Sequence, residues 1–190
     1  MRVRLVIVLC LAAVVIALAL PAVAAAKTTA KTSFSSTLSA TNKANVWGSA
    51  KLKLQMRPLG LRVTLRVRGL QSGKPHAAAI YGFVDGRQAK CPGPSADTNG
   101  DGLISGPEVR AVAGEPLVWL TPFKKGKRHG TWVYQGRISG AALAALNPVG
   151  VRLSERIIVV SGVTQMPTYT LPFWDPDAPA ACGAIKADEL

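Results

Sequence analysis

The feature that most constrains the fold is an alternation of apolar and basic side chains over residues 51–68. The basic positions in this segment that alternate with apolar ones are Lys51, Lys53, Arg57, Arg62, Arg66 and Arg68, and all of them except Arg57 are candidate anion-binding residues. A Pro-Leu-Gly turn at residues 58–60 divides the segment into two halves. Because successive side chains of a β-strand point to opposite faces of a sheet, the segment predicts a β-hairpin with one apolar face and one basic face.

The rest of the chain also predicts short strands, joined by connections rich in Gly and Pro. The expected strands cover residues 77–84, 117–123, 131–138, 156–160, 168–171 and 181–185. The basic residues 124–130 predict the tip of a hairpin between the second and third of these strands, and residues 140–146 predict a short helix. The β-branched run at 156–160 is typical of a central core strand. Together these patterns favour an all-β fold, a Greek-key β-sandwich or barrel.

The N-terminus has the pattern of an export signal. Arg2 and Arg4 precede a long apolar run, Pro21 interrupts it, and the small residues at 22–26 offer a cleavage site. The alternative is an uncleaved anchor, because the apolar stretch is long enough to span a bilayer. We expect cleavage, a secreted or cell-envelope location and no membrane span in the mature protein; the alanine-rich signal is typical of bacteria. The predicted parts are a signal peptide at 1–26, a tail at 27–32 and one domain at 33–190.

Cysteine and histidine are scarce, which excludes several kinds of site. The chain has three cysteines and two histidines. Two histidines exclude a histidine-rich catalytic metal centre, and the spacing of these residues excludes a zinc finger. Cys10 leaves with the signal, so the remaining pair predicts a disulfide between Cys91 and Cys182 in an oxidising compartment. The alternative for that pair is two free, buried thiols.

Positive charge is concentrated in the first part of the mature chain. Residues 27–90 contain 12 basic residues and one acidic residue, whereas residues 91–190 contain nine of each. The basic face of the hairpin is either a solvated sheet surface whose charges discourage edge pairing or a surface that binds a polyanion. In an exported protein the polyanion would be a cell-wall polymer, an acidic polysaccharide or anionic lipid, and nucleic acid is not an expected partner.

Residues 97–108 match the calcium-binding loop of an EF-hand at every defining position. Oxygen atoms at alternate positions suit a hard cation, and Gly102 permits the sharp turn that the loop requires. The expected calcium ligands are the side chains of Asp97, Asn99, Asp101, Ser105 and Glu108 and the main-chain carbonyl of Leu103. The alternative is a surface turn rich in Asp and Gly.

The flanks of this loop differ from those of an EF-hand. A Cys-Pro-Gly-Pro sequence at residues 91–94 stands where an entering helix belongs, and residues 107–112 allow only a short exiting helix. No second loop follows. A dockerin needs a tandem pair of such loops, so the single loop argues against a dockerin, and it also argues against a calcium-switched pair of helices. We therefore expect an isolated calcium loop, inserted in another fold, whose role is structural.

Short motifs resemble those of a known family. The Ala-Cys-Gly-Ala-Ile sequence at 181–185 is similar to the final strand of copper/zinc superoxide dismutases and of the related CHRD (chordin-type) domains. Residues 156–160 resemble the strand that precedes a copper-ligand histidine, and residues 75–82 resemble a histidine-rich stretch of these domains. The resemblance spans about residues 33–187. It implies their β fold and a disulfide from the final strand to a mid-chain loop, whose place Cys91 holds.

The departures from the family bear on activity. Where its metal-ligating histidines would stand, this chain has Ala79, Tyr81 and Ser161, and only His76 remains. Pro179 stands near the position of the anion-guiding arginine of the dismutases. Redox cycling of copper needs several imidazoles, so the resemblance implies a fold and argues against dismutase activity.

We therefore expect a secreted, non-catalytic, calcium-binding β module with a role in binding, adhesion or structure at the cell envelope. Its partner would be an anionic envelope polymer or another extracellular protein. One alternative is a polyanion binder that uses residues 51–68. Another is an unrecognised extracellular hydrolase, for which Asp175 and Asp177 are a candidate carboxylate pair.

Overall fold

The alternating segment forms the predicted hairpin. In the computed structural model, which describes residues 32–125, 131–146, 152–165 and 173–188, strand β2 (Trp47–Met56) pairs antiparallel with β3 (Leu59–Arg68). The apolar side chains of β3 from Leu61 to Val67 are almost completely buried, and the basic ones are exposed. The turn lies at residues 57–58 instead of 58–60, because Leu59 and Gly60 already pair with β2.

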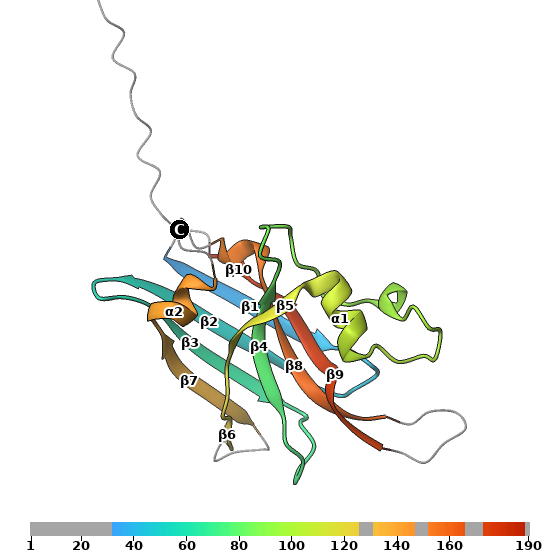
Figure 1. Cartoon of the computed structure of the whole chain (residues 1–190). Helices are drawn as coiled ribbons and strands as arrows, with labels where there is room; N and C mark the ends of the chain where they lie inside the picture. The colour runs from blue at the N-terminus through green and yellow to red at the C-terminus, as the bar shows by residue number, and fades with distance from the viewer. Residues whose placement is uncertain (1–31, 126–130, 147–151, 166–172, 189–190) are drawn as a thin grey trace, which may run out of the picture. The chain divides into compact units, whose positions relative to one another are not determined.

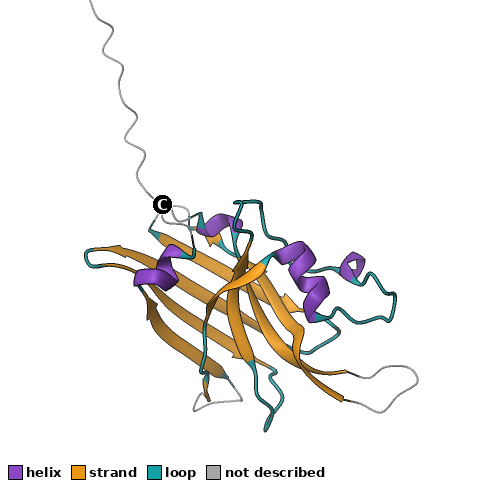
Figure 2. Cartoon of the chain, viewed as in Figure 1, coloured by secondary structure: helices purple, strands orange, loops and turns teal. Residues whose placement is uncertain are grey.

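The strands make one continuous antiparallel sheet that curls around its core (Figures 1 and 2). The sheet order is β5-β4-β8-β9-β1-β2-β3-β7-β6, with β10 beside β1. The further strands are β1 (Ser33–Ala40), β4 (Ala77–Gly82), β5 (Glu115–Trp119), β6 (Lys124–Lys125), β7 (Trp132–Ile138), β8 (Ile157–Gln165), β9 (Phe173–Ala184) and β10 (Lys186–Ala187). The helical segments are α1 (Gly106–Ala113), α2 (Gly140–Ala144) and the short 3-10 turns η1 (Pro94–Ala96) and η2 (Leu153–Glu155). The prediction of an all-β, barrel-like fold is confirmed.

Two apolar clusters lie on opposite sides of the strands β4, β8 and β9. The main core fills the inside of the curled sheet and includes Ile80 and Ile158. A second cluster on the outside includes Ile157 and Val159, and α1 packs against it through Val109. Burial on both faces explains why β8 begins with a continuous apolar run, as predicted for a central strand. The connection between β4 and β5 thus covers the outer face of this half of the sheet.

One predicted pairing is wrong. The sequence predicts a hairpin of residues 117–123 and 131–138, but β5 pairs with β4, and β7 pairs with β3 and with the short β6. Val118 and Leu120 are buried in the main core together with side chains of β4, and this burial favours the long-range partner. The hairpin tip at 126–130, the predicted strand at 168–171 and the signal peptide lie outside the described residues. None of the helices within the described ranges has the length and apolar character needed to cross a membrane.

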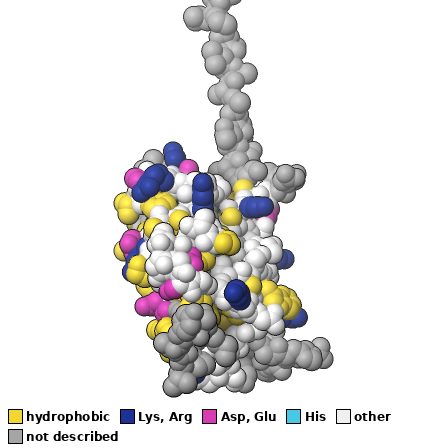
Figure 3. All heavy atoms as spheres, turned by 90° about the vertical axis from the view of Figure 1, so that its right-hand side faces the viewer, with side chains coloured by type: hydrophobic (Ala, Val, Ile, Leu, Met, Phe, Trp, Pro, Cys, Tyr) yellow, Lys and Arg dark blue, Asp and Glu magenta, His cyan; other side chains and the backbone are white. Residues whose placement is uncertain are grey.

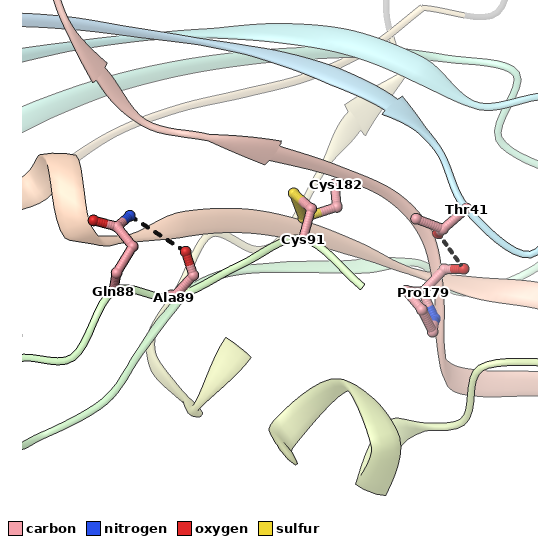
Figure 4. Close-up of a disulfide and its surroundings, with 6 residues drawn as sticks. All are labelled: Thr41, Gln88, Ala89, Cys91, Pro179 and Cys182. Atoms are coloured by element: carbon pink, nitrogen blue, oxygen red, sulfur yellow. Dashed lines mark hydrogen bonds between the residues drawn. A yellow bond between two sulfur atoms is a disulfide. The ribbon is translucent and has the colours of Figure 1, made fainter. Parts of the chain in front are cut away.

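A disulfide fixes the connection between β4 and β5 to the sheet. It joins Cys91, which follows β4, to Cys182 in β9, with 5.6 Å between the Cα atoms (Figure 4). The predicted pairing is therefore confirmed. In the same region the hydroxyl of Thr41 donates a 2.7 Å hydrogen bond to the carbonyl of Pro179, which ties the end of β1 to β9.

The disulfide closes a loop with a sequence separation of 91 residues, so we expect its loss to be costly. The double variant C91A/C182A should unfold with a free energy about 4–5 kcal/mol lower than the wild type in the chain-entropy model. Denaturant unfolding with and without a reductant measures this difference. Reductant should lower the stability of the wild type to that of the variant and leave the variant unchanged; a wild type insensitive to complete reduction would contradict the prediction.

Candidate functional site

The outer face of β1, β2, β3 and β7 carries the predicted cations and forms the basic face. The strand register places Lys53, Arg62 and Arg137 directly side by side across β2, β3 and β7. The next positions along these strands, in the same order, are Lys51, Thr64 and Gln135. Arg66 and Arg68 continue the charge along β3, and the guanidinium of Arg68 lies 5.0 Å from the ring centre of the exposed Trp47. The structure therefore brings all five predicted cations onto one face.

Few carboxylates offset this charge. Along the neighbouring β1, the outward positions Ser33, Ser35 and Thr37 are hydroxyl residues. Asp188 accepts a 2.7 Å hydrogen bond from the hydroxyl of Ser35. The ion pairs found among the described residues involve Arg87, Arg110 and Arg152, so none includes a cation of the basic face.

Cations that lie directly opposite each other in a sheet are destabilising. Two charges about 4 Å apart repel by about 1 kcal/mol in water. The strand register makes Lys53, Arg62 and Arg137 neighbours of this kind, and none of the three takes part in the described ion pairs. An anion placed on this row would reduce any repulsion between these cations, so the arrangement is chemically suited to a polyanionic ligand.

A shallow groove of about 290 Å³ lies on this face between β3 and β7. Arg62, Thr64, Gln135 and Arg137 contribute to its lining. One nitrogen of Arg137, Nη2, donates hydrogen bonds to the carbonyl oxygens of Pro58 at 2.8 Å and Leu59 at 3.4 Å. The Arg137 guanidinium is thereby held at one end of the groove.

Arg137 is a member of this face that was not predicted from the sequence. The alternation of Gln135 and Arg137 with Tyr134, Gly136 and Ile138 could have shown that both point outward, because they occupy alternate positions of the predicted strand 131–138. What the alternation could not show is that β7 pairs with β3 and so places Arg137 beside Arg62.

The acidic loop, residues 97–108, is held together by its own side chains. The carboxylate of Asp97 accepts 2.8 Å hydrogen bonds from the main-chain N–H groups of Gly100 and Gly102. Asp101 accepts one from the N–H of Leu103, also at 2.8 Å. Gly100 and Gly102 have φ values of 72° and 84°, a conformation that favours glycine. The short exiting helix α1 follows as predicted.

Glu108 closes the loop from the first turn of α1. Its Oε1 accepts hydrogen bonds from the N–H and hydroxyl of Thr98 and from the N–H of Asn99. Its Oε2 accepts bonds from the N–H and hydroxyl of Ser105, which caps the helix. The N–H of Ser105 is the largest contribution that lowers the pKa of Glu108 from 4.5 to about 2, and the side chain stays buried. The charged carboxylate therefore joins the beginning of the loop to its end through hydrogen bonds.

Asn42, in the turn between β1 and β2, connects the acidic loop to the sheet. Its side-chain oxygen accepts a 2.7 Å hydrogen bond from the N–H of Ile104. Its amide nitrogen donates to the carbonyls of Ile104 and Pro179 at 2.8 and 3.1 Å. The loop is thus bound to the sheet at a point next to β1.

The oxygen types of the acidic loop fit calcium, but its carboxylates are turned to other partners. Among the described residues, no three His, Cys, Asp or Glu side chains are gathered as a group that could hold a metal ion. Both oxygens of Glu108 already accept hydrogen bonds from 98–99 and 105. Binding of calcium in the EF-hand manner would require Glu108 to exchange some of these donors for the ion.

The positions at which the resemblance places missing metal-ligating histidines are buried in this structure. Ala79, Tyr81 and Ser161 are buried. His76 is half-buried, with its ring nitrogens 3.4 and 3.0 Å from the carbonyl oxygens of Ser161 and Gln71. Its ring packs edge-on against Trp174 at 5.0 Å between the ring centres. The His76 ring therefore lies against β8 and β9, through Ser161 and Trp174.

Comparisons with known proteins give a distant similarity of fold. No family model matches the sequence, and no curated protein matches it. Two solved structures that are similar in fold are mutants of superoxide dismutase 5 from Candida albicans, each with one glutamate replaced. The mutant with glutamine at that position is 11% identical, with a TM-score of 0.41 over 85% of this chain and 95% of that chain. The mutant with alanine there is 12% identical, with a TM-score of 0.39 over 83% and 90% of the two chains.

Because Glu108 must be ionised to accept all of its hydrogen bonds, we expect the stability of the protein to depend on pH. Because the folded-state pKa of about 2 lies below the ordinary 4.5, its contribution is complete above pH 4.5 and is lost as the pH falls towards 2. E108Q should lower the free energy of unfolding by about 2 kcal/mol at neutral pH, since the amide mismatches donors that the carboxylate satisfied. Urea unfolding across this pH range measures both effects.

E115Q is the matched control, because Glu115 follows α1 but is exposed and lies 3.9 Å from its partner Arg110. This control should resemble the wild type at every pH. An E108Q variant whose stability falls with acid as steeply as that of the wild type would contradict the role of Glu108.

Proposed function

We propose that this chain is an exported, non-catalytic binding module whose basic face holds an anionic polymer of the cell envelope. The observation that carries the proposal is the row of Lys53, Arg62 and Arg137 across three neighbouring strands. A row of like charges is unfavourable in the free protein and is compensated when a polyanion lies across it. An open sheet face presents such a row to an extended chain.

Export is supported by the sequence and by the disulfide. The N-terminal pattern is that of a signal peptide, and disulfides persist in oxidising compartments outside the cytosol. In that setting, anionic polysaccharides and other charged envelope polymers are the available polyanions.

The non-catalytic part of the proposal rests on the side chains at the family's metal positions. Ala79, Tyr81 and Ser161 cannot replace imidazole ligands of copper. The carboxylate pair considered for a hydrolase lies in β9, where Asp175 Oδ1 accepts hydrogen bonds from the N–H groups of Asp177 and Ala178. This carboxylate thus stabilises the local backbone of β9.

Binding to an anionic polymer should depend on the basic face and on salt. The triple variant K53Q/R62Q/R66Q should bind polyphosphate about tenfold more weakly at low salt, since each exposed ionic contact contributes about 0.5 kcal/mol. The slope of log affinity against log salt should also decrease by about two to three, because fewer counterions are released. Titration calorimetry or biolayer interferometry at several salt concentrations provides both quantities.

The matched control is K43Q/K74Q/K90Q, which removes the same charge from exposed lysines outside the basic face. It should keep most of the wild-type affinity. Equal losses in the two triple variants would show that net charge alone governs binding, and the basic face would then have no special role.

A second candidate role, calcium binding by the acidic loop, is favoured by the loop's glycine turns and by α1, which begins at the position of an exiting helix. We propose Asp97, Asn99, Asp101, Leu103, Ser105 and Glu108 as its ligands. The ion would stabilise the connection between β4 and β5, and Glu108 would turn from its hydrogen-bond donors to the ion. At a calcium concentration ten times the dissociation constant, the gain is about 1.4 kcal/mol.

The variant D101N tests calcium binding with little change to the internal bonds of the loop. Asparagine keeps an oxygen that can accept from the N–H of Leu103, as Asp101 Oδ1 does now, but it removes one ligand charge and the acceptor of an exposed 2.9 Å hydrogen bond from Asn99 Nδ2. Calcium should raise the melting temperature of the wild type by more than that of D101N, each compared with the same protein in chelator. Identical melting of the wild type with calcium and with chelator would refute the site.

A further inference from the structure

We infer that the groove between Arg62 and Arg137 is a discrete subsite for a tetrahedral oxyanion, the phosphate or sulfate ester of the bound polymer. This inference rests on the proposed function and makes it specific. It assigns one charged group of the ligand to one place on the basic face and gives Arg137 the role of anchor.

Arg137 is fixed before any ligand arrives. Its Nη2 donates to the carbonyls of Pro58 and Leu59 in the turn between β2 and β3. Its guanidinium also lies against Gly60: a Cβ atom added there would stand 2.5 Å from Nε of Arg137. A guanidinium that is held in this way loses little side-chain entropy when it binds an anion, so the groove is preorganised at this end.

The donors around the groove fit a tetrahedral anion better than a carboxylate. A carboxylate has two oxygens in one plane, which a single guanidinium fork can satisfy. The groove instead offers Arg62 and Arg137 from two strands, with the hydroxyl of Thr64 and the amide of Gln135 in the next row. Donors from several directions suit the oxygens of a phosphate or sulfate group, which lie out of one plane.

The size of the groove limits what it holds. Pockets for whole small ligands have volumes of about 300–1,000 Å³. At about 290 Å³ this open groove is at the lower end, and it suits one charged group of a longer chain. The remaining cations of the face, such as Arg66 and Lys51, would then contact neighbouring groups of the same polymer.

The variant G60A tests the subsite without a change in charge. The atoms nearest to the added Cβ all belong to the Arg137 side chain, so the guanidinium must leave its position. We expect G60A and R137Q each to weaken binding to polyphosphate and to dextran sulfate roughly fivefold. Binding to polygalacturonate, a carboxylate polymer, should be weaker in the wild type and unchanged by G60A.

G93A is the matched control, because Gly93 has a negative φ and open space around its added Cβ. It should bind every polymer as the wild type does, and the melting temperatures of all variants show whether they are folded. Comparison of the polyphosphate and dextran sulfate affinities identifies whether the subsite prefers a phosphate or a sulfate group.

The outcomes distinguish the subsite from the proposed function. If the wild type binds polyphosphate and loses affinity in K53Q/R62Q/R66Q but not in G60A, the polymer surface stands and the subsite is wrong. If polygalacturonate binds as tightly as polyphosphate at equal charge, the assignment to a tetrahedral oxyanion is wrong. If the wild type binds none of the three polymers, the proposed function itself fails.

Discussion

The structure depends on an unequal covering of one curled sheet. Strands β1 to β5 and β7 to β9 bury their inner side chains in the main core, but among the described residues the second apolar cluster covers the outer face over β4, β8 and β9 alone. The cover is the connection between β4 and β5, and the disulfide from Cys91 to Cys182 holds it in place. Figure 3 shows the side of the molecule that carries this connection, where acidic and basic side chains are interspersed.

The other half of the outer face is left open, and this is where the basic face lies. Paired residues of neighbouring strands share a face, so the pairing of Cys182 with Ser39 and of Ser35 with Lys51 shows that the two halves are continuous. The cover ends beside β1, at the hydrogen bonds between Asn42 and Ile104. The boundary between the covered and open halves therefore has a specific chemical basis.

Local sequence patterns predicted the elements well and their long-range partners poorly. The alternation in residues 51–68 determines both the hairpin and its exposed face, because pattern and pairing are local. The β-branched run of β8 predicts burial on both faces, but nothing in it identifies α1 as the outer cover. The pairing of β7 with β3 joins segments that are distant in the chain, and for that reason Arg137 was not predicted beside Arg62. The cysteine count, by contrast, did predict a long-range contact, since only one pair remains after removal of the signal.

Within the described part of the chain, the carboxylates of the acidic loop do not pair with the cations of the basic face, because they already accept hydrogen bonds within their own loop. Asp97, Asp101 and Glu108 direct their carboxylates to main-chain N–H groups of their own loop. A carboxylate that is satisfied in this way gains little from a distant, hydrated lysine or arginine. The charge of the acidic loop is therefore used to hold the cover over β4, β8 and β9. The positive charge of the basic face stays available to an external anion. The negative charges of the acidic loop thus serve to stabilise the structure, and the positive charges of the basic face are free for binding.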